Sequence, residues 1–184
     1  MKRTHDMGGF SLLETLLAMV IIAIMAGVTY PTLQSHSTEN LAVAARSVAA
    51  ALRYAQSESV RQGQVHGVYV DHTSERVYVY RMDTGSPPDP DTTLYHPVDK
   101  KLYDFTLGSD VTGGTVIANA SAPFTYTGLL GAHNEILFDT ERGLPYYDDG
   151  TSLYPLINGD ITISQETLTT TVRISVITGR VTIL

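Results

Sequence analysis

Residues 8–28 read GGFSLLETLLAMVIIAIMAGV, and this stretch decides the architecture of the chain. Nearly every residue after the two glycines is apolar, but Glu14 places a carboxylate close to the start of the run. A charged side chain in bilayer hydrocarbon costs about 2.5–3.5 kcal/mol on insertion scales. The position of this acid, shortly after two glycines and a basic leader, therefore needs an explanation.

The length of the apolar run predicts a membrane-spanning helix. No charged side chain occurs between Thr15 and Leu33, and about 20 such residues are enough to cross roughly 30 Å of hydrocarbon. We therefore predict a transmembrane helix over residues 10–33. Lys2 and Arg3 precede the run, so the positive-inside rule places the N-terminus in the cytoplasm and the rest of the chain outside it.

A cleaved secretory signal peptide is an alternative interpretation of the same N-terminus. Three features count against it: Glu14 interrupts the apolar core, the uncharged run is long for a signal core, and no clean A-x-A site follows.

Length and composition limit the remaining possibilities. The chain has 184 residues, a formal net charge of -7 and no cysteine. This length allows one ordinary domain and a long additional element. The acidic balance argues against non-specific nucleic-acid binding, and the lack of cysteine excludes disulfides and thiolate metal sites.

A second helical pattern follows the apolar run, over residues 34–63. It is rich in strong helix formers, and its larger apolar side chains recur at alternate spacings of four and three, which is the stripe of an amphipathic helix. Gly63 is a plausible stop. We predict one nearly continuous helix from about residue 10 to residue 62. The stripe consists of Leu41, Ala45, Val48, Leu52 and Ala55, and Arg46, Arg53 and Gln56 fall largely outside it.

Pro31 lies inside this long helix. Proline removes the hydrogen bond to the carbonyl four residues earlier, which here is that of Gly27, and its ring crowds the same carbonyl. We therefore predict a bend or a locally loosened turn at Gly27 and Pro31, made softer by the missing side chain of the glycine.

The period of the pattern changes after Gly63, and residues 64–184 read as a β-rich domain. Residues 65–71 and 76–82 alternate and are rich in Val and Tyr, which predicts a hairpin. Further strands are predicted, and no helical period of useful length appears. The predicted fold class is α+β: a long N-terminal helix whose amphipathic half packs on an antiparallel, β-sandwich-like domain. The further strands are expected at 101–107, 114–118, 135–139, 160–164, 169–177 and 180–184.

The residues from Gly8 to Glu14 resemble the type III signal of type IV pilins and type II secretion pseudopilins. In that family a prepilin peptidase removes a short basic leader, here residues 1–9, by cutting after the position of Gly9, and then methylates the new N-terminus, here Phe10. Glu14 matches the acid of the motif, and Pro31 lies where pilins carry a helix-loosening proline. The resemblance implies a pilin fold and a single-pass protein of the inner membrane with a periplasmic C-terminal domain.

Electrostatics gives Glu14 a reason within this interpretation. Cleavage after Gly9 creates an amine on Phe10, and in a helical filament the amine of one subunit can approach Glu14 of a neighbour. An opposite charge in a medium of low dielectric offsets part of the desolvation cost of both groups. The alternative is an ordinary membrane anchor whose glutamate reaches the headgroups.

The resemblance extends to the minor pseudopilin H and FimT group, over residues 8–82 and 172–184. It implies a non-enzymatic minor subunit of a type II secretion or type IV pilus-like filament. The implied partners are other pilins or pseudopilins, the prepilin peptidase and an inner-membrane assembly platform. The resemblance leaves open which machine the subunit serves.

Other function classes have weaker support in the sequence. Some FimT-type pilins bind DNA through a C-terminal G-R-x-R motif. Here Gly179 and Arg180 are present, the second arginine of the motif is absent, and Arg173 is the one other nearby cation, so nucleic-acid binding is disfavoured. The acid pairs Asp89/Asp91, Asp139/Glu141 and Asp148/Asp149 lack the spacing of a calcium loop, and no metal or cofactor site is predicted. A membrane-tethered periplasmic enzyme or binding protein remains the alternative of another class, with no catalytic motif to support it.

Overall fold

The computed structural model describes residues 11–82, 94–98, 100–119 and 121–184, and within this range the side chains of residues 26–36 are left out. The chain divides into two compact units, residues 1–36 and residues 37–184. The second unit holds the sheet and the second part of the long helix, and we call it the body.

One helix, α1 (Leu12–Gln62), runs through 51 residues and joins the two units. It ends at Gly63, whose amide donates to the Ser59 carbonyl at 3.0 Å and whose φ of 64° suits a residue without a side chain. The prediction of a single long helix is confirmed. Within the part of the chain that the structure describes, no helix is long and apolar enough to cross a membrane.

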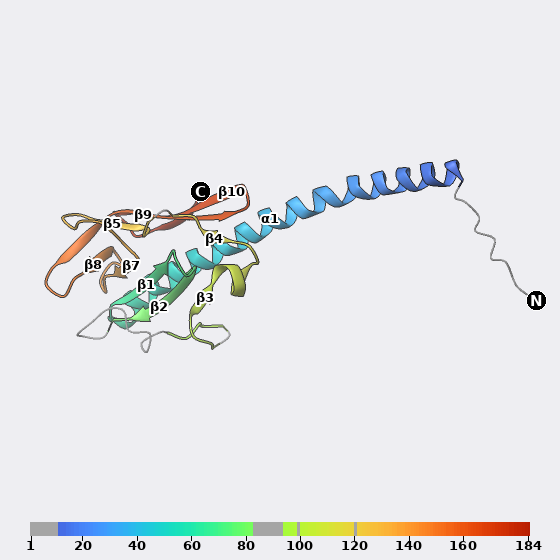
Figure 1. Cartoon of the computed structure of the whole chain (residues 1–184). Helices are drawn as coiled ribbons and strands as arrows, with labels where there is room; N and C mark the ends of the chain where they lie inside the picture. The colour runs from blue at the N-terminus through green and yellow to red at the C-terminus, as the bar shows by residue number, and fades with distance from the viewer. Residues whose placement is uncertain (1–10, 83–93, 99, 120) are drawn as a thin grey trace, which may run out of the picture. The chain divides into compact units, whose positions relative to one another are not determined.

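The strands of the body form an antiparallel sheet (Figure 1). Its main path is β11-β10-β9-β8-β7-β1-β2-β3, while β4 and β5 pair with β9, and β6 pairs with β5. The long strand β9 therefore pairs with β4, β5, β8 and β10. The strands are β1 (His66–Asp71), β2 (Arg76–Arg81), β3 (Asp104–Thr106), β4 (Val116–Ile117), β5 (Phe124–Tyr126), β6 (Ala132–His133), β7 (Glu135–Phe138), β8 (Pro145–Asp148), β9 (Leu153–Gln165), β10 (Leu168–Ile174) and β11 (Val181–Ile183).

The body encloses the second part of α1 more fully than the predicted single stripe would require. Four alanines of this part have no exposed surface. Ala45 belongs to the predicted stripe, whereas Ala44, Ala49 and Ala51 lie outside it. They belong to one core together with side chains from β1, β2 and β7 and from β5, β9 and β10. Figure 1 shows the β1–β2 and β9–β10 hairpins as two layers with α1 entering between them. Small alanine side chains let both layers approach the helix, so the predicted stripe was too narrow.

The solvent-facing side of this part of α1 is correspondingly thin. Between Leu41 and Val60, the exposed residues recur at spacings of three and four, which places them along one line of the helix. They are Val43, Arg46, Ala50, Arg53, Ser57 and Val60.

Most predicted strands are present, and the differences have identifiable causes. The hairpin β1–β2 and the C-terminal strands β10 and β11 are confirmed, although β10 ends at Ile174 and residues 175–179 form the turn. Strand β9 begins seven residues earlier than the predicted strand at 160, because Pro155 hides its first half from a pattern-based prediction. The structure also has a five-residue π-helical turn, η2 (Leu107–Val111), where no helix was predicted.

A second small core lies on the face of the β1–β2–β7 sheet that points away from α1. It contains Tyr78, Tyr80 and Leu137. The ring of Tyr80 lies across Gly67 of the neighbouring strand β1, and its hydroxyl donates to the Glu135 carboxylate on β7. Burial raises the pKa of Glu135, and burial together with Glu135 raises the pKa of Tyr80 well above its ordinary value. Tyr80 of β2 thus contacts both neighbouring strands: its ring fills the space left by Gly67 on β1, and its hydroxyl binds Glu135 on β7.

The connection from α1 to β1 contains a buried histidine. His66 has no exposed surface; its Nδ1–H donates to the Gln64 carbonyl at 2.7 Å, and its Nε2 has no hydrogen-bond partner. Burial lowers the pKa of His66, while the Gln64 carbonyl and the Glu58 carboxylate act in the opposite direction. The protonated imidazole is therefore disfavoured in the folded chain.

The space left by Gly67 gives a first prediction. A Cβ at position 67 would lie 2.6 Å from the Tyr80 ring and 2.7 Å from Leu137 Cδ2, so Gly67→Ala should overpack this core and lower the free energy of unfolding by about 1–3 kcal/mol. Chemical denaturation of the full chain in detergent measures the loss. The matched control is Gly113→Ala, where a Cβ meets nothing within 4 Å. Equal stability of the two variants would show that the core beside Gly67 has room for a methyl group.

The buried histidine gives a second prediction. The unfolded chain binds a proton at His66 near pH 6.5, and the folded chain resists it, so the free energy of unfolding should fall as the pH drops below about 6.5. The slope is at most about 1.4 kcal/mol per pH unit. His66→Gln should flatten this slope in denaturation curves recorded between pH 7.5 and pH 5.5.

Comparing the variant with the wild type separates His66 from Glu135, whose raised pKa contributes with the opposite sign. A wild-type slope that persists unchanged in the variant would show that His66 does not cause it.

Candidate functional site

The first unit presents an apolar helical surface that no described residue of that unit covers. The large side chains of the described part, residues 11–25, range in exposure from 47% at Val20 to 81% at Leu12. Such a set of exposed leucine, isoleucine, valine and methionine side chains is far larger than the single apolar residues normally found on a soluble surface. This surface is therefore built to contact lipid or protein.

Glu14 lies in the first turn of α1, on this apolar surface. Its side chain is exposed, and its carboxylate has no ion-pair or hydrogen-bond partner among the described residues. The one other polar side chain between Leu12 and Met25, Thr15, donates its hydroxyl to the Leu12 carbonyl at 2.9 Å. Glu14 is thus the one polar group that this stretch offers to its surroundings, and a negative charge in the first turn is also favoured by the helix dipole.

The remaining predicted residues of the N-terminal motif cannot be placed at the level of side chains. Gly9, Phe10 and the leader 1–9 lie outside the described residues. The helix continues through Gly27 and Pro31, but the side chains of residues 26–36 lie outside the described part, so the predicted bend stays a prediction.

The two arginines considered for DNA binding have different surroundings. Arg173 on β10 stands opposite Asp160 on β9, and its guanidinium donates two hydrogen bonds to that carboxylate at 2.8 and 2.7 Å. Arg180 follows the β10–β11 turn, is exposed, and makes no ion pair with any described residue. The structure therefore leaves a single available cation where two were considered.

Asp139, Asp148 and Asp149 make the hydrogen bonds of ordinary loop acids, whereas Asp89 and Asp91 lie outside the described residues. Asp139 Oδ1 accepts from the amides of residues 141, 142 and 143 at 2.6–3.0 Å. Asp148 and Asp149 accept from amides within their own turn. Among the described residues, no group of three histidine, aspartate or glutamate side chains could hold a metal ion.

Two polar residues of α1 that the sequence pattern left on the solvent side connect the helix to a distant loop and to the distant strand β11. Gln56 Nε2 donates to the Gly143 carbonyl at 2.8 Å, and Arg53 donates to the Val181 carbonyl at 2.9 Å. A methyl group at Gly143 or Gly179 would overlap Gln56, and both glycines have positive φ. Sequence reasoning gave these residues no role, since their partners lie 87 and 128 residues away.

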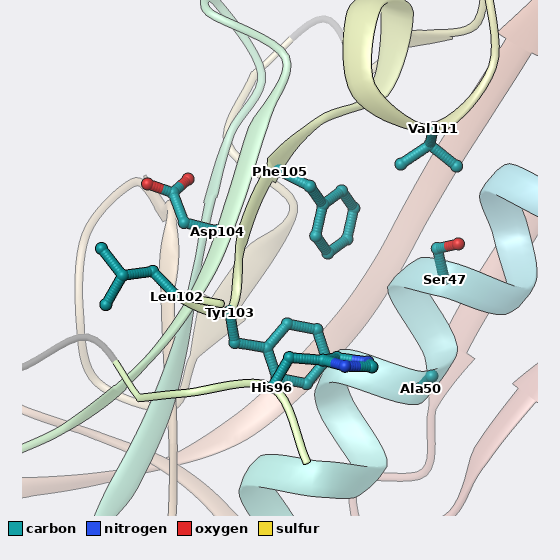
Figure 2. A pocket seen from close by; sticks show the side chains of 8 residues that line it. All are labelled: Ser47, Ala50, His96, Leu102, Tyr103, Asp104, Phe105 and Val111. Carbon is teal, nitrogen blue, oxygen red and sulfur yellow. The ribbon is translucent and has the colours of Figure 1, made fainter. Parts of the chain in front are cut away.

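A cavity of about 250 Å³ lies beside α1, between Ala50 and the segment that leads into β3. Figure 2 shows His96 and Tyr103 in this cavity; their rings meet edge to face with centroids 4.6 Å apart. Ser47 donates its hydroxyl to the Val43 carbonyl at 3.1 Å, and Asp104 is paired with Arg76 at 2.8 Å. Because its serine and its acid are both engaged, this cavity gives no support to the alternative of a tethered enzyme.

Residues 5–30 match the family model described as the prokaryotic N-terminal methylation motif. The match confirms that the N-terminus resembles the methylation signal of type IV pilin-like proteins. Cleavage after Gly9, methylation of Phe10 and the assembly role of Glu14 stay predictions. No curated protein sequence matches the chain.

Two solved proteins have a similar arrangement of elements. The minor pseudopilin EpsH from the type 2 secretion system of Vibrio cholerae is 13% identical, with a TM-score of 0.47 over 79% of this chain and 96% of that one. The type IV minor pilin FimU of Pseudomonas aeruginosa is 18% identical, with a TM-score of 0.46 over 80% of this chain and 90% of that one. A second crystal form of FimU shows 17% sequence identity and a TM-score of 0.44, and the match covers 77% of this chain and 90% of that one. Likenesses at this level do not assign a function.

Proposed function

We propose that the chain is a non-enzymatic minor pilin or pseudopilin, a subunit of a type II secretion or type IV pilus-like filament. The observation that carries the proposal is the exposed apolar start of α1, with Glu14 as its one outward polar group, inside a matched methylation motif. A helix of this kind suits two environments in turn. Lipid surrounds it before assembly, and other helices replace the lipid in a filament core.

Processing prepares the subunit in this scheme. A prepilin peptidase cuts after Gly9 and methylates Phe10, and the basic leader of residues 1–9 keeps the N-terminus on the cytoplasmic side until then. Residues 10–33 anchor the subunit in the inner membrane, and the body from residue 37 onward lies in the periplasm. An assembly platform in the same membrane then passes the subunit to the filament.

Glu14 acts during assembly as the partner of an amine. The helix offers its carboxylate no partner within the described chain, so in a protein or lipid core it needs one from outside. The amine created at Phe10, on a neighbour or on the same subunit, supplies the opposite charge four residues away in sequence. The pair orients the helix because a buried carboxylate without a partner is strongly disfavoured.

Removing the charge tests this role. Glu14→Leu should leave membrane insertion and processing intact and should lower the amount of subunit recovered in sheared filaments at least about tenfold, because the amine loses its partner. Immunoblotting of the sheared and membrane fractions measures the ratio. Thr15→Leu is the matched control, since it removes a polar side chain at the next position whose hydroxyl is already satisfied by the helix itself.

Mass spectrometry of the membrane fraction determines whether both variants begin with a methylated Phe10. Full assembly of Glu14→Leu would refute the pairing, and a chain that still begins at Met1 in cells with an active peptidase would refute the proposed function itself.

DNA uptake is the second function considered, and the geometry does not favour it. Arg173 is held by Asp160, the chain carries a net charge of -7, and phosphate contacts depend on available cations. We expect no salt-sensitive retardation of DNA by the full chain in a gel-shift at low salt, and no difference between the wild type and Arg180→Ala. Retardation that salt weakens and Arg180→Ala abolishes would reverse this conclusion.

A further inference from the structure

We propose that the outer edge of β11 binds an extended, acid-bearing segment of a different filament subunit, which adds to the sheet as one more strand. The contact site is the side of Val181–Ile183 that faces away from β10. The inference rests on the proposed function, because it takes the partner to be a neighbouring subunit, and it needs only one copy of this chain in the filament.

The backbone of β11 directs hydrogen-bonding groups away from β10. Thr171 and Leu184 exchange two hydrogen bonds, with N···O distances of 3.3 and 2.9 Å. In an antiparallel ladder such pairs alternate with pairs whose backbone groups point outward, so the amides of Val181 and Ile183 point away from β10. The bond from Arg53 to the outward Val181 carbonyl agrees with this geometry. Neither amide has an acceptor among the described residues, so both are available to a partner.

The other end of the main sheet path is occupied by its own chain. At β3 the amide of Thr106 donates to the Asp110 carboxylate at 2.8 Å, and Asp104 is paired with Arg76. At β11 no carboxylate of the described residues accepts from an outward amide. Of the two ends of this path, β11 is therefore the one that offers donors to an external acceptor.

Three arginines surround this edge. Arg46 and Arg53 lie two turns apart on the exposed line of α1. Arg53 contacts the Val181 carbonyl, Arg46 lines one groove together with Ile183, and Arg180 directly precedes the strand. All three arginines are exposed and make no ion pair with a described residue. On a chain with a net charge of -7 this is a local concentration of positive charge, which favours a partner segment that carries an acid.

An apolar groove at the same edge adds a second requirement. It has a volume of about 470 Å³, and Leu41 of α1, Leu168 of β10 and Ile183 contribute apolar side chains to its walls. Side chains of an added strand that lie directly opposite Val181 and Ile183 point toward α1, as those two side chains do. The matching segment therefore carries an acid opposite Val181, beside Arg53. It carries an apolar residue two positions away, opposite Ile183 and the groove.

Arg53 makes the edge selective for such a segment. Its guanidinium occupies the Val181 carbonyl at 2.9 Å, so an added strand has to displace it to complete the ladder. A carboxylate on the strand gives the displaced guanidinium a charged, bidentate acceptor, whereas a strand without an acid offers no replacement. The site therefore accepts acidic strands and disfavours neutral ones.

Site-specific photo-crosslinking tests the contact in the intact system. The photoreactive residue benzoylphenylalanine replaces Thr182 in the full chain, which is produced in a host with an active prepilin peptidase and its filament machine. We expect a crosslink to a different filament subunit, mapped by mass spectrometry to a segment with an acid and an apolar residue two positions apart. The yield should be at least about fivefold above that of the control.

The control places the same photoreactive residue at Val116, a 40% exposed position on β4. Strand β4 is also an edge, since it pairs with β9 alone. There, however, the Glu75 carboxylate already accepts from the amide of Ile117, so no donor of that amide is left for a partner.

Proline at position 183 separates the backbone from the side chain. Ile183→Pro removes one outward amide and leaves the hydrogen bonds between β10 and β11 in place, while Ile183→Val keeps that amide. With the photoreactive residue at 182, Ile183→Pro should lower the yield about fivefold relative to Ile183→Val, because one hydrogen bond to the partner is lost. Gly67→Ala destabilises the body on β1, away from this edge, and an unchanged yield in that variant shows that the proline acts at the edge.

Charge reversal tests the expected acid. Arg53→Glu should lower the yield about tenfold, because it places like charges against each other, and changing the mapped acid of the partner to lysine should restore it. Equal yields at 182 and 116 overturn the proposal, as do equal yields for Ile183→Pro and Ile183→Val. A crosslink only to a second copy of this chain, to lipid or to nucleic acid also overturns it.

Mass spectrometry of the N-terminus in the same membranes separates this proposal from the proposed function. A methylated Phe10 with equal yields at 182 and 116 refutes the strand contact alone. A chain that begins at Met1 while the specific crosslink persists refutes the proposed function and leaves the strand contact standing.

Discussion

The fold depends on how closely two layers of strands can approach one helix. Alanine occupies positions of α1 that face the two layers, and its small side chain lets each layer pack near the helix axis. The enclosed helix then provides a core for strands that are mostly short and could not bury an apolar face by themselves. The body is thus organised around α1, and the sheet depends on the helix more than on its own hairpins.

The same helix has opposite properties at its two ends. In the body it is surrounded and leaves only a thin exposed line, whereas residues 12–25 expose large apolar side chains on every side. One continuous helix thus has a segment buried in a core and a segment whose large apolar side chains are exposed. The proposed function follows from this contrast, because an exposed apolar helix has to be covered by lipid or by other subunits.

Strong periodic signals made part of this structure predictable. Helix formers and the four–three spacing identified α1, and alternating Val and Tyr identified the hairpin β1–β2. Strands β5, β6 and β8 were missed because they are short and lie among turn-forming residues, such as Pro123 directly before β5 and Pro145 at the start of β8. Arg173 illustrates the limit for sites: its pairing with Asp160 depends on the register of β9 and β10, which no local pattern fixes.

The hydrogen bond from Arg53 to the Val181 carbonyl concerns the last strand of the sheet. Strand β11 is an edge, and the carbonyls and amides of an unprotected edge invite a foreign strand to add to the sheet. The arginine occupies one of these acceptors and places a charged side chain beside the rim. In the proposed function the chain polymerises through its helix, so uncontrolled growth through its β-structure would compete with assembly, and a single guanidinium on α1 contributes to preventing it.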